Sequence, residues 1–193
     1  ESYIGLVEVG VGLIPGGGGL AFGARRAAEE QGAAPDANLL DFLKKYVLAA
    51  GTAQVSRSAI EARALGYLLP EDRIVFHRQE LLYAAIREAK AMSDAGYRPP
   101  RKSMIKVAGR TGVATVSSQM LNMRDGGFIS AHDYHLGRTI AEVMCGGDVE
   151  PGSVVDEEWL MALERKAFTS LLTHPKTQER IMGMMQTGKP VRN

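Results

Sequence analysis

The chain of 193 residues carries 23 Lys and Arg against 22 Asp and Glu, which gives a formal net charge of +1. This balance excludes a strongly cationic nucleic-acid binder, and it disfavours a polybasic membrane-surface protein. The apolar fraction of 45% and the charged fraction of 23% are typical of a globular protein with one domain or two small ones. The single cysteine, Cys145, excludes an intrachain disulfide framework and a multi-cysteine metal site, and it is compatible with a cytoplasmic protein.

The first 96 residues alternate short extended segments with helices. Apolar and β-branched residues predict a strand over residues 3–14, which Pro15 and Gly16–Gly19 interrupt. Helices are predicted at 21–31, 39–50, 60–65 and 79–95, and RIVF at 73–76 predicts a further strand. The helix at 79–95 is strongly amphipathic, because apolar residues recur at helical spacing at Leu82, Ala85, Ile86 and Ala89. No run approaches the roughly 20 apolar residues of a membrane span, and no leader peptide is visible.

The remaining residues are predicted to be almost wholly helical. Residues 97–102, YRPPRK, form a kinked basic linker, and they place the predicted domain boundary between 1–96 and 97–193. A short extended segment at 104–109 precedes predicted helices at 114–123, 131–145, 157–172 and 176–187. Ser130 and Asp133 match a capping box for the second of these helices. The predicted class is therefore mostly α with a few short strands.

Glu8 is the first candidate for chemistry, since it is the only charged residue between Ser2 and Arg25. A carboxylate among apolar residues loses hydration, so its pKa rises and it can exchange a proton near neutral pH. The alternative interpretation is a glutamate on an edge strand that faces solvent.

The run Gly16–Gly19 is the second candidate, because glycines before a helix leave backbone N–H groups free to meet an anion. No Lys-Ser or Lys-Thr pair follows as in a Walker A loop, and the dinucleotide-binding fingerprint matches poorly. A tight packing turn is the favoured interpretation.

The histidines and the methionines suggest weaker hypotheses. His132 and His135 share one helix face, but a metal site there lacks a third ligand, so we predict no metal. Cys145 has no evident cationic neighbour, which favours a buried, unreactive thiol. Trp159, Leu160 and the late methionines form apolar stripes that fit either a core or an interface.

Residues 4–19, IGLVEVGVGLIPGGGG, resemble the second catalytic motif of the crotonase, or enoyl-CoA hydratase/isomerase, superfamily. The resemblance implies that Glu8 is a catalytic general acid/base that protonates Cα, and that Pro15, Gly16 and Gly17 contact the substrate. It also implies that residues 1–96 are the C-terminal half of a crotonase-like α/β core and that residues 97–193 are a helical C-terminal extension.

Residues 65–193, which include NMRDGGFISAHD and CGGDVEPG, resemble the C-terminal extension of bacterial fused 3-hydroxyacyl-CoA dehydrogenase/enoyl-CoA hydratase proteins of fatty-acid β-oxidation. The resemblance implies hydration of a trans-2-enoyl-CoA thioester, with no cofactor for this segment and NAD for the dehydrogenase region of the parent. The first half of the crotonase core, with the second glutamate that separates hydratase from isomerase, is not in this sequence. The expected partners are therefore that half and the dehydrogenase region of the same polypeptide, and a homo-oligomer stays open. The segment alone is expected to be inactive.

A second hypothesis comes from the helices after YRPPRK, whose Met, Leu and Trp residues suit protein contacts. On this interpretation the chain is a helical assembly or docking module of the parent dehydrogenase, with no catalytic role of its own. On a third and weaker hypothesis, the chain is a fragment of the helical substrate domain of a dehydrogenase. The lack of a Ser/His/Asn constellation at suitable spacing argues against this hypothesis.

Overall fold

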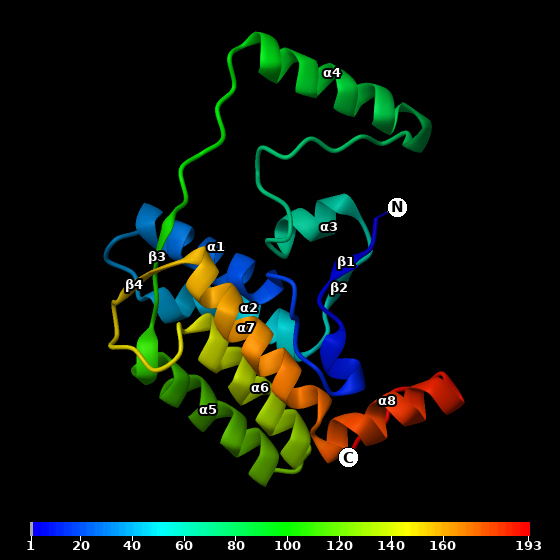
Figure 1. Cartoon of the computed structure of the whole chain (residues 1–193). Coiled ribbons are helices and arrows are strands. Elements are labelled where there is room, and N and C mark those ends of the chain that lie inside the picture. The colour runs from blue at the N-terminus through cyan, green and yellow to red at the C-terminus, as the bar shows by residue number, and fades with distance from the viewer. Residues whose placement is uncertain (1) are drawn as a thin grey trace.

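The computed structural model describes residues 2–193, which are mainly helical (Figure 1). The α-helices are α1 (Gly19–Ala33), α2 (Leu39–Gly51), α3 (Ala59–Ala64), α4 (Leu81–Asp94), α5 (Gly109–Asp125), α6 (Ala131–Met144), α7 (Glu157–Leu172) and α8 (Pro175–Thr187). Two short 3₁₀ helices are η1 (Glu8–Val11) and η2 (Arg78–Glu80). The predicted class, mostly α with a few short strands, is confirmed.

The strands form two small antiparallel pairs. β1 (Ile4–Gly5) pairs with β2 (Val55–Ser56), and β3 (Met104–Lys106) pairs with β4 (Val154–Asp156). Each pair joins segments about 50 residues apart in the chain. The two pairs are separate two-stranded sheets, and neither forms a larger sheet.

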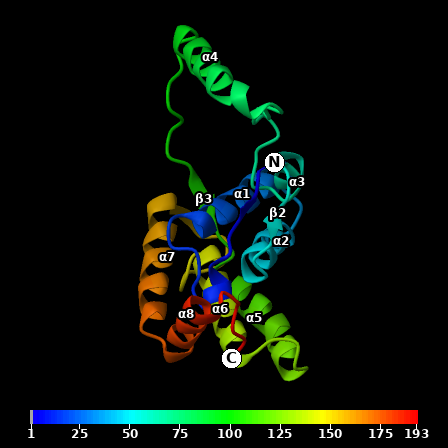
Figure 2. The same ribbon diagram turned by 90° about the vertical axis from the view of Figure 1, so that its right-hand side faces the viewer.

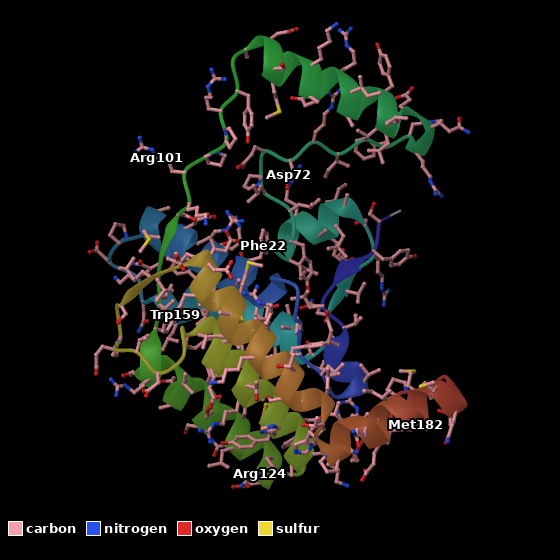
Figure 3. The ribbon with its side chains drawn as sticks, in the orientation of Figure 1. Phe22, Asp72, Arg101, Arg124, Trp159 and Met182 are labelled. Atoms are coloured by element: carbon pink, nitrogen blue, oxygen red, sulfur yellow. The ribbon has the colours of Figure 1, made fainter. Side chains whose placement is uncertain are left out.

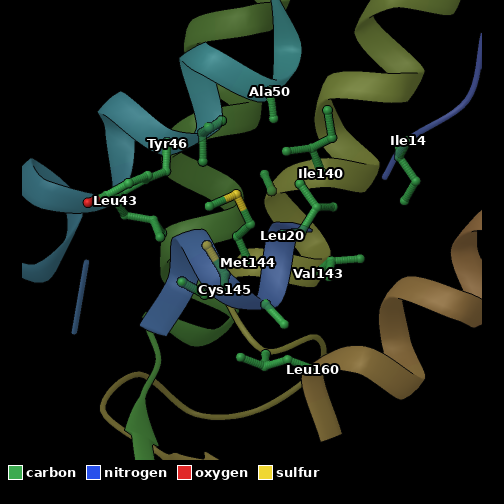
Figure 4. Packing of buried hydrophobic residues seen from close by; sticks show 14 of the residues in the cluster. Ile14, Leu20, Leu43, Tyr46, Ala50, Ile140, Val143, Met144, Cys145 and Leu160 are labelled. Carbon is green, nitrogen blue, oxygen red and sulfur yellow. The ribbon is translucent and has the colours of Figure 1, made fainter. Parts of the chain in front are cut away.

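Helix α6 is the centre of the core, because eight of its 14 residues are buried. It packs against α5, α7, α2 and α1, and α1 and α2 also pack against each other. Figure 4 shows Leu20 of α1, Ile140 and Met144 of α6, and Leu160 of α7 converging in this core. Each of these side chains is almost completely buried, and burial of that kind stabilises a fold by about 1.5–3 kcal/mol per side chain.

Capping residues confirm several predicted helix starts. The Asn38 side chain accepts a hydrogen bond from the Leu40 amide, and the Ser58 side chain accepts one from the Glu61 amide. The Ser130–Asp133 capping box is present with both of its hydrogen bonds, and α7 has the predicted bounds.

The predicted strand over residues 3–14 is wrong beyond Gly5. Residues 8–11 form η1, and the chain then turns at Gly12, where φ is +78°. The amides of Gly10 and Gly12 donate to the carbonyls of Val7 and Val9, so these residues satisfy their hydrogen bonds locally and have no need of a neighbouring strand.

The second strand predicted wrongly is residues 73–76, which form part of an extended arm without strand pairing. α5 begins at Gly109 instead of 114, because the extended segment before it ends at Lys106.

The boundary predicted at residue 97 lies between α4 and β3. Helices from both sides of it share one core, because α1 packs against α6 and α7 and α2 packs against α6. The division into domains at 1–96 and 97–193 stays a prediction. α4 alone stands apart from the rest of the molecule, and this is visible in two views at right angles (Figure 1 and Figure 2). Across residues 2–193, no helix has the length and apolar character required to cross a membrane.

Candidate functional site

Glu8, the predicted general acid/base, lies on η1 and is half-buried. Its Oε2 atom is buried and has no hydrogen-bond partner among the described residues. The nearby Tyr67 hydroxyl donates to the Gln54 carbonyl at 2.9 Å. Burial raises the pKa of Tyr67 above its usual value, and the negative charge of Glu8 adds to that rise. Glu8 thus has one buried carboxylate oxygen without a partner among the described residues, and the Tyr67 side chain lies near it.

The glycine turn is occupied by a residue that the sequence analysis missed, Glu164 of α7. Its side chain is 0% exposed, and its carboxylate accepts hydrogen bonds from the Gly18 amide at 3.0 Å and the Ala21 amide at 3.2 Å. Burial raises the pKa of Glu164, while the amides of the first turn of α1 act to lower it. The anion that this helix start would attract is therefore already supplied by the protein.

The other predicted substrate contacts lie in the same turn. Pro15 is buried, and a Cβ built at Gly16 would lie 2.7 Å from the Phe168 ring of α7. Gly17 is exposed and has open space around its Cα. The close contact at Gly16 supports the packing-turn interpretation of the glycine run, because it lets α7 approach the chain before α1.

A signal for Glu164 does exist in the sequence. Leu160, Glu164 and Leu171 lie on one face of α7 at helical spacing, and all three are buried. A single glutamate in an otherwise apolar stripe indicates a carboxylate that is buried with a partner, although the sequence does not show which partner.

Three histidines lie together at the N-terminal end of α6. The rings of His132 and His174 stack with centroids 4.7 Å apart, and His135 lies 5.3 Å from His174 and 6.0 Å from His132. Burial lowers the pKa of His132 to about 4, and the charge of Arg180 contributes to the same shift. Residues 2–193 contain no group of three or more His, Cys, Asp or Glu side chains arranged to hold a metal ion.

Cys145 is fully buried at the end of α6. Burial raises the pKa of its thiol to about 12, so the reactive thiolate is scarce at neutral pH. Among the residues of the apolar stripe on α7, Leu160 is in the core, whereas Trp159 is 48% exposed and donates from Nε1 to the Gly146 carbonyl at 3.0 Å.

The surface has a large groove and a smaller pocket, and the smaller pocket borders the motif at residues 4–19, with Ile4, Leu6 and Gly19 in its lining. A groove of about 850 Å³ runs between α5, α6 and α7, with Val113, Val143 and Leu163 in its lining and Arg138 and Lys166 beside them. A smaller pocket of about 230 Å³ is mostly apolar and is lined by residues that include Leu6, Tyr46 and Tyr67. Neither lining includes Glu8, Pro15, Gly16 or Gly17, so the structure does not unite the predicted residues around a cavity.

The comparisons with known proteins find one curated protein that is similar to this chain. The chain is 42% identical over 197 aligned residues to a protein of Bacillus subtilis (strain 168) named "Probable 3-hydroxyacyl-CoA dehydrogenase". The alignment covers 100% of this chain and 24% of that protein, so the chain spans about a quarter of the relative's length. No family model and no solved structure matches the chain.

These findings correct the prediction of a crotonase-superfamily hydratase/isomerase, which is wrong. The matching protein is named for the dehydrogenation of 3-hydroxyacyl-CoA, and no family model or solved structure supports the resemblance of residues 4–19. The physical reason is local: glycines before a helix also serve close packing, and here Glu164 and Phe168 fill the space that a ligand would need. Glu8 as a catalytic residue, and Pro15, Gly16 and Gly17 as substrate contacts, stay predictions. The chain is similar along its whole length to part of an enzyme named as a 3-hydroxyacyl-CoA dehydrogenase.

Proposed function

We propose that this chain is a helical docking module of a larger 3-hydroxyacyl-CoA dehydrogenase of fatty-acid oxidation, without a catalytic centre of its own. The observation that carries the proposal is the 42% identity that extends over the whole chain but over only 24% of the named dehydrogenase. A segment that keeps its sequence from end to end within a much longer enzyme supports a shared structural role in that enzyme.

The internal chemistry of the fold agrees with a structural role. The helix start at the glycine turn is neutralised by Glu164, and Cys145 is held as a thiol by burial. His132 is kept neutral and hydrogen-bonded in a packed helix contact. Glu164, Cys145 and His132 are thus engaged in the packing of the helices.

The NAD of such a dehydrogenase would bind elsewhere in the longer polypeptide. A dinucleotide site of the usual kind needs parallel strands with a glycine-rich turn between strand and helix. Both strand pairs among the described residues are antiparallel, and the glycine turn before α1 is filled by Glu164. The acyl-CoA substrate would meet its hydride acceptor at that other site, and a cytoplasmic location is part of the same proposal.

The experiment uses the native protein that contains this sequence. Its intact mass is measured, and dehydrogenase activity is followed by the oxidation of NADH with acetoacetyl-CoA. We expect a protein several times heavier than 20.8 kDa that oxidises NADH, whereas the purified 193-residue chain has no activity above the buffer rate. NADH oxidation by the pure chain would contradict the non-catalytic role. A native protein that consists of this chain alone would contradict the proposal that the chain is a module of a longer enzyme.

A further inference from the structure

Helix α4 exposes an unpartnered apolar stripe. The stripe consists of residues that share one side of the helix, namely Leu81, Leu82, Ala85, Ile86, Ala89 and Met92, and all of them are exposed. Leu82 is 71% exposed and Ile86 is 58% exposed, although both belong to a well-formed helix. In this helix only Ala84 is buried. Such a row of large apolar side chains in water marks a contact surface.

A helix as short as α4 is not expected to be stable without packing against another surface. α4 has 14 residues, and isolated helices shorter than about 12–15 residues are marginal in water. Most of the stability of a helix in a protein comes from packing of its apolar face, and covering the large side chains of the stripe would contribute about 1.5–3 kcal/mol for each. The stripe therefore needs a covering surface that residues 2–193 do not provide.

The contact between the first arm and α4 leaves the side of the stripe with Leu82 and Ile86 free. Arg73 of the first arm pairs with Glu88 at 3.0 Å, and this contact lies away from Leu82 and Ile86 on the helix circumference. The first arm is held to the main body by Arg63, which donates to the Leu69 carbonyl at 3.3 Å and to the Asp72 carbonyl. Figure 3 shows Asp72 on this arm and Arg101 on the other, with α4 beyond both. The helix is thus presented at a distance from the core by anchored segments.

We infer that the stripe of α4 docks into an apolar groove on another part of the same, longer polypeptide. The inference rests on the proposed function and names the surface through which the module docks. About three quarters of the relative lies outside the segment that matches this chain, so a large covalently linked partner exists in a protein of that kind. A covalent link gives an effective concentration in the millimolar range, which favours such a partner over free molecules. An amphipathic helix in an apolar groove is a common mode of recognition.

The charges of α4 favour a protein surface over a lipid surface as the partner of the stripe. Arg87 and Lys90 are balanced on the helix by Glu88 and Asp94. Helices that lie on membranes usually carry a polar face rich in Lys and Arg, which α4 lacks. A balanced polar side next to an apolar stripe is suited to the rim and the core of a protein interface.

The test measures hydrogen–deuterium exchange of residues 81–94 in the full-length protein. Ala89→Glu places a charge in the stripe, and Ala91→Glu places the same charge on the opposite side of the same helix, where the side chain is also exposed. In the unaltered protein we expect α4 amides to exchange at least about tenfold more slowly than those of the arms, independently of protein concentration. Ala89→Glu should abolish this protection and Ala91→Glu should retain it, with the unfolding midpoint of the core unchanged in both.

Three results would overturn the inference. Exchange of α4 as fast as that of the arms in the unaltered protein would show that nothing covers the stripe. Protection that disappears on dilution would identify a second copy of the chain as the occupant. Protection that appears only with vesicles of phosphatidylglycerol and phosphatidylcholine would identify a lipid surface. The NADH assay of the same preparation tests the proposed function separately, since an active full-length enzyme with an unprotected α4 refutes only the docking surface.

Discussion

At the scale of single residues, Glu164 decides what the glycine turn can do. Its buried carboxylate replaces the external anion that the first turn of α1 would otherwise attract. Glu164 also joins α7 to the start of α1, since it lies 143 positions after Ala21, whose amide it binds. A residue that sequence reasoning had no cause to pair with the turn thus explains why the turn is a packing device.

Glu164→Gln should lower the free energy of unfolding by about 1–3 kcal/mol, as measured by urea unfolding. The amide has one accepting oxygen, and its NH₂ group would face an amide donor that the carboxylate now satisfies. The matched control is Glu158→Gln, on the same helix, where the exposed side chain pairs with Arg165 at 2.6 Å. The control should change stability by no more than about 0.5 kcal/mol. Equal stability of the two variants would refute the role assigned to Glu164.

Gly109→Ala should destabilise the protein by about 2–4 kcal/mol. Gly109 has a φ of +58°, and a Cβ built there would lie 2.4 Å from the Val149 carbonyl oxygen. Gly32, near the end of α1, has open space and an ordinary helical backbone, so Gly32→Ala should instead stabilise by roughly 0.5 kcal/mol. Urea unfolding midpoints measure both, and a loss of stability in Gly32→Ala as large as in Gly109→Ala would contradict this account.

At the scale of elements, α8 is attached to η1 and α6 through buried polar groups. The Thr177 hydroxyl donates to the Gly12 carbonyl at 2.6 Å and lies 3.1 Å from His132 Nε2. Since the hydroxyl hydrogen is used, His132 Nε2 is the donor, and Nδ1 is the unprotonated nitrogen, buried without a partner. Arg180 completes the attachment, with Nη1 donating to the Val9 carbonyl at 3.2 Å and Nη2 pairing with Asp133 at 2.8 Å.

The attachment of α8 should weaken in mild acid. Protonation of His132 would create a buried cation beside Arg180, and the pKa of about 4 reflects this cost. The unfolded chain binds a proton near pH 6.5, so the contribution to stability is complete above that pH and is lost as the pH falls toward 4. The pKa of the neighbouring His135 is lowered by burial and by His174, which acts in the same direction. Asp133 has a lowered pKa and loses its contribution only below about pH 4.

We expect the free energy of unfolding to be about 2 kcal/mol smaller near pH 5 than near pH 7.5 because of His132. Urea titrations at the two pH values measure the difference. His132→Gln keeps a donor for Thr177 and removes the titration, so its stability should change much less between them. A pH dependence that is the same in His132→Gln as in the unaltered chain would contradict the assignment to His132.

At the scale of the whole molecule, the core unites both sides of the linker at residues 97–102. Leu20 of α1 and Tyr46 of α2 precede the linker, whereas Ile140 of α6 and Leu160 of α7 follow it, and all four belong to one buried cluster. Figure 4 shows Leu20, Tyr46 and Ile140 in the same region of packed side chains. Separation of the two parts would expose this surface to water, at a cost of about 25 cal/mol for each Å² of apolar area.

Cleavage at a specific protease site placed within the exposed residues 98–102 should therefore leave the two pieces bound to each other. Size-exclusion chromatography in native buffer should give one peak that contains both pieces, and the same sample in denaturing urea should give two. Two native peaks would show that residues 1–96 and 97–193 are independent domains, as the linker suggested.

The local sequence by itself determined most of the helices and their starts. Helix 157–172 and the capping box at Ser130 follow from contacts between residues three or four apart, which the printed sequence contains. The amphipathic pattern of residues 79–95 likewise predicts a helix with one apolar side, and the structure has α4 there.

Only the tertiary structure decided what these elements do to each other. It placed Glu164 at the glycine turn, His174 against His132, and η1 against α8. These arrangements depend on contacts between residues 40 to 165 positions apart, whose formation is governed by packing and burial of the whole chain rather than by local propensity. For the same reason the sequence of the glycine turn does not show that the carboxylate of Glu164, 146 positions from Gly18, is its partner.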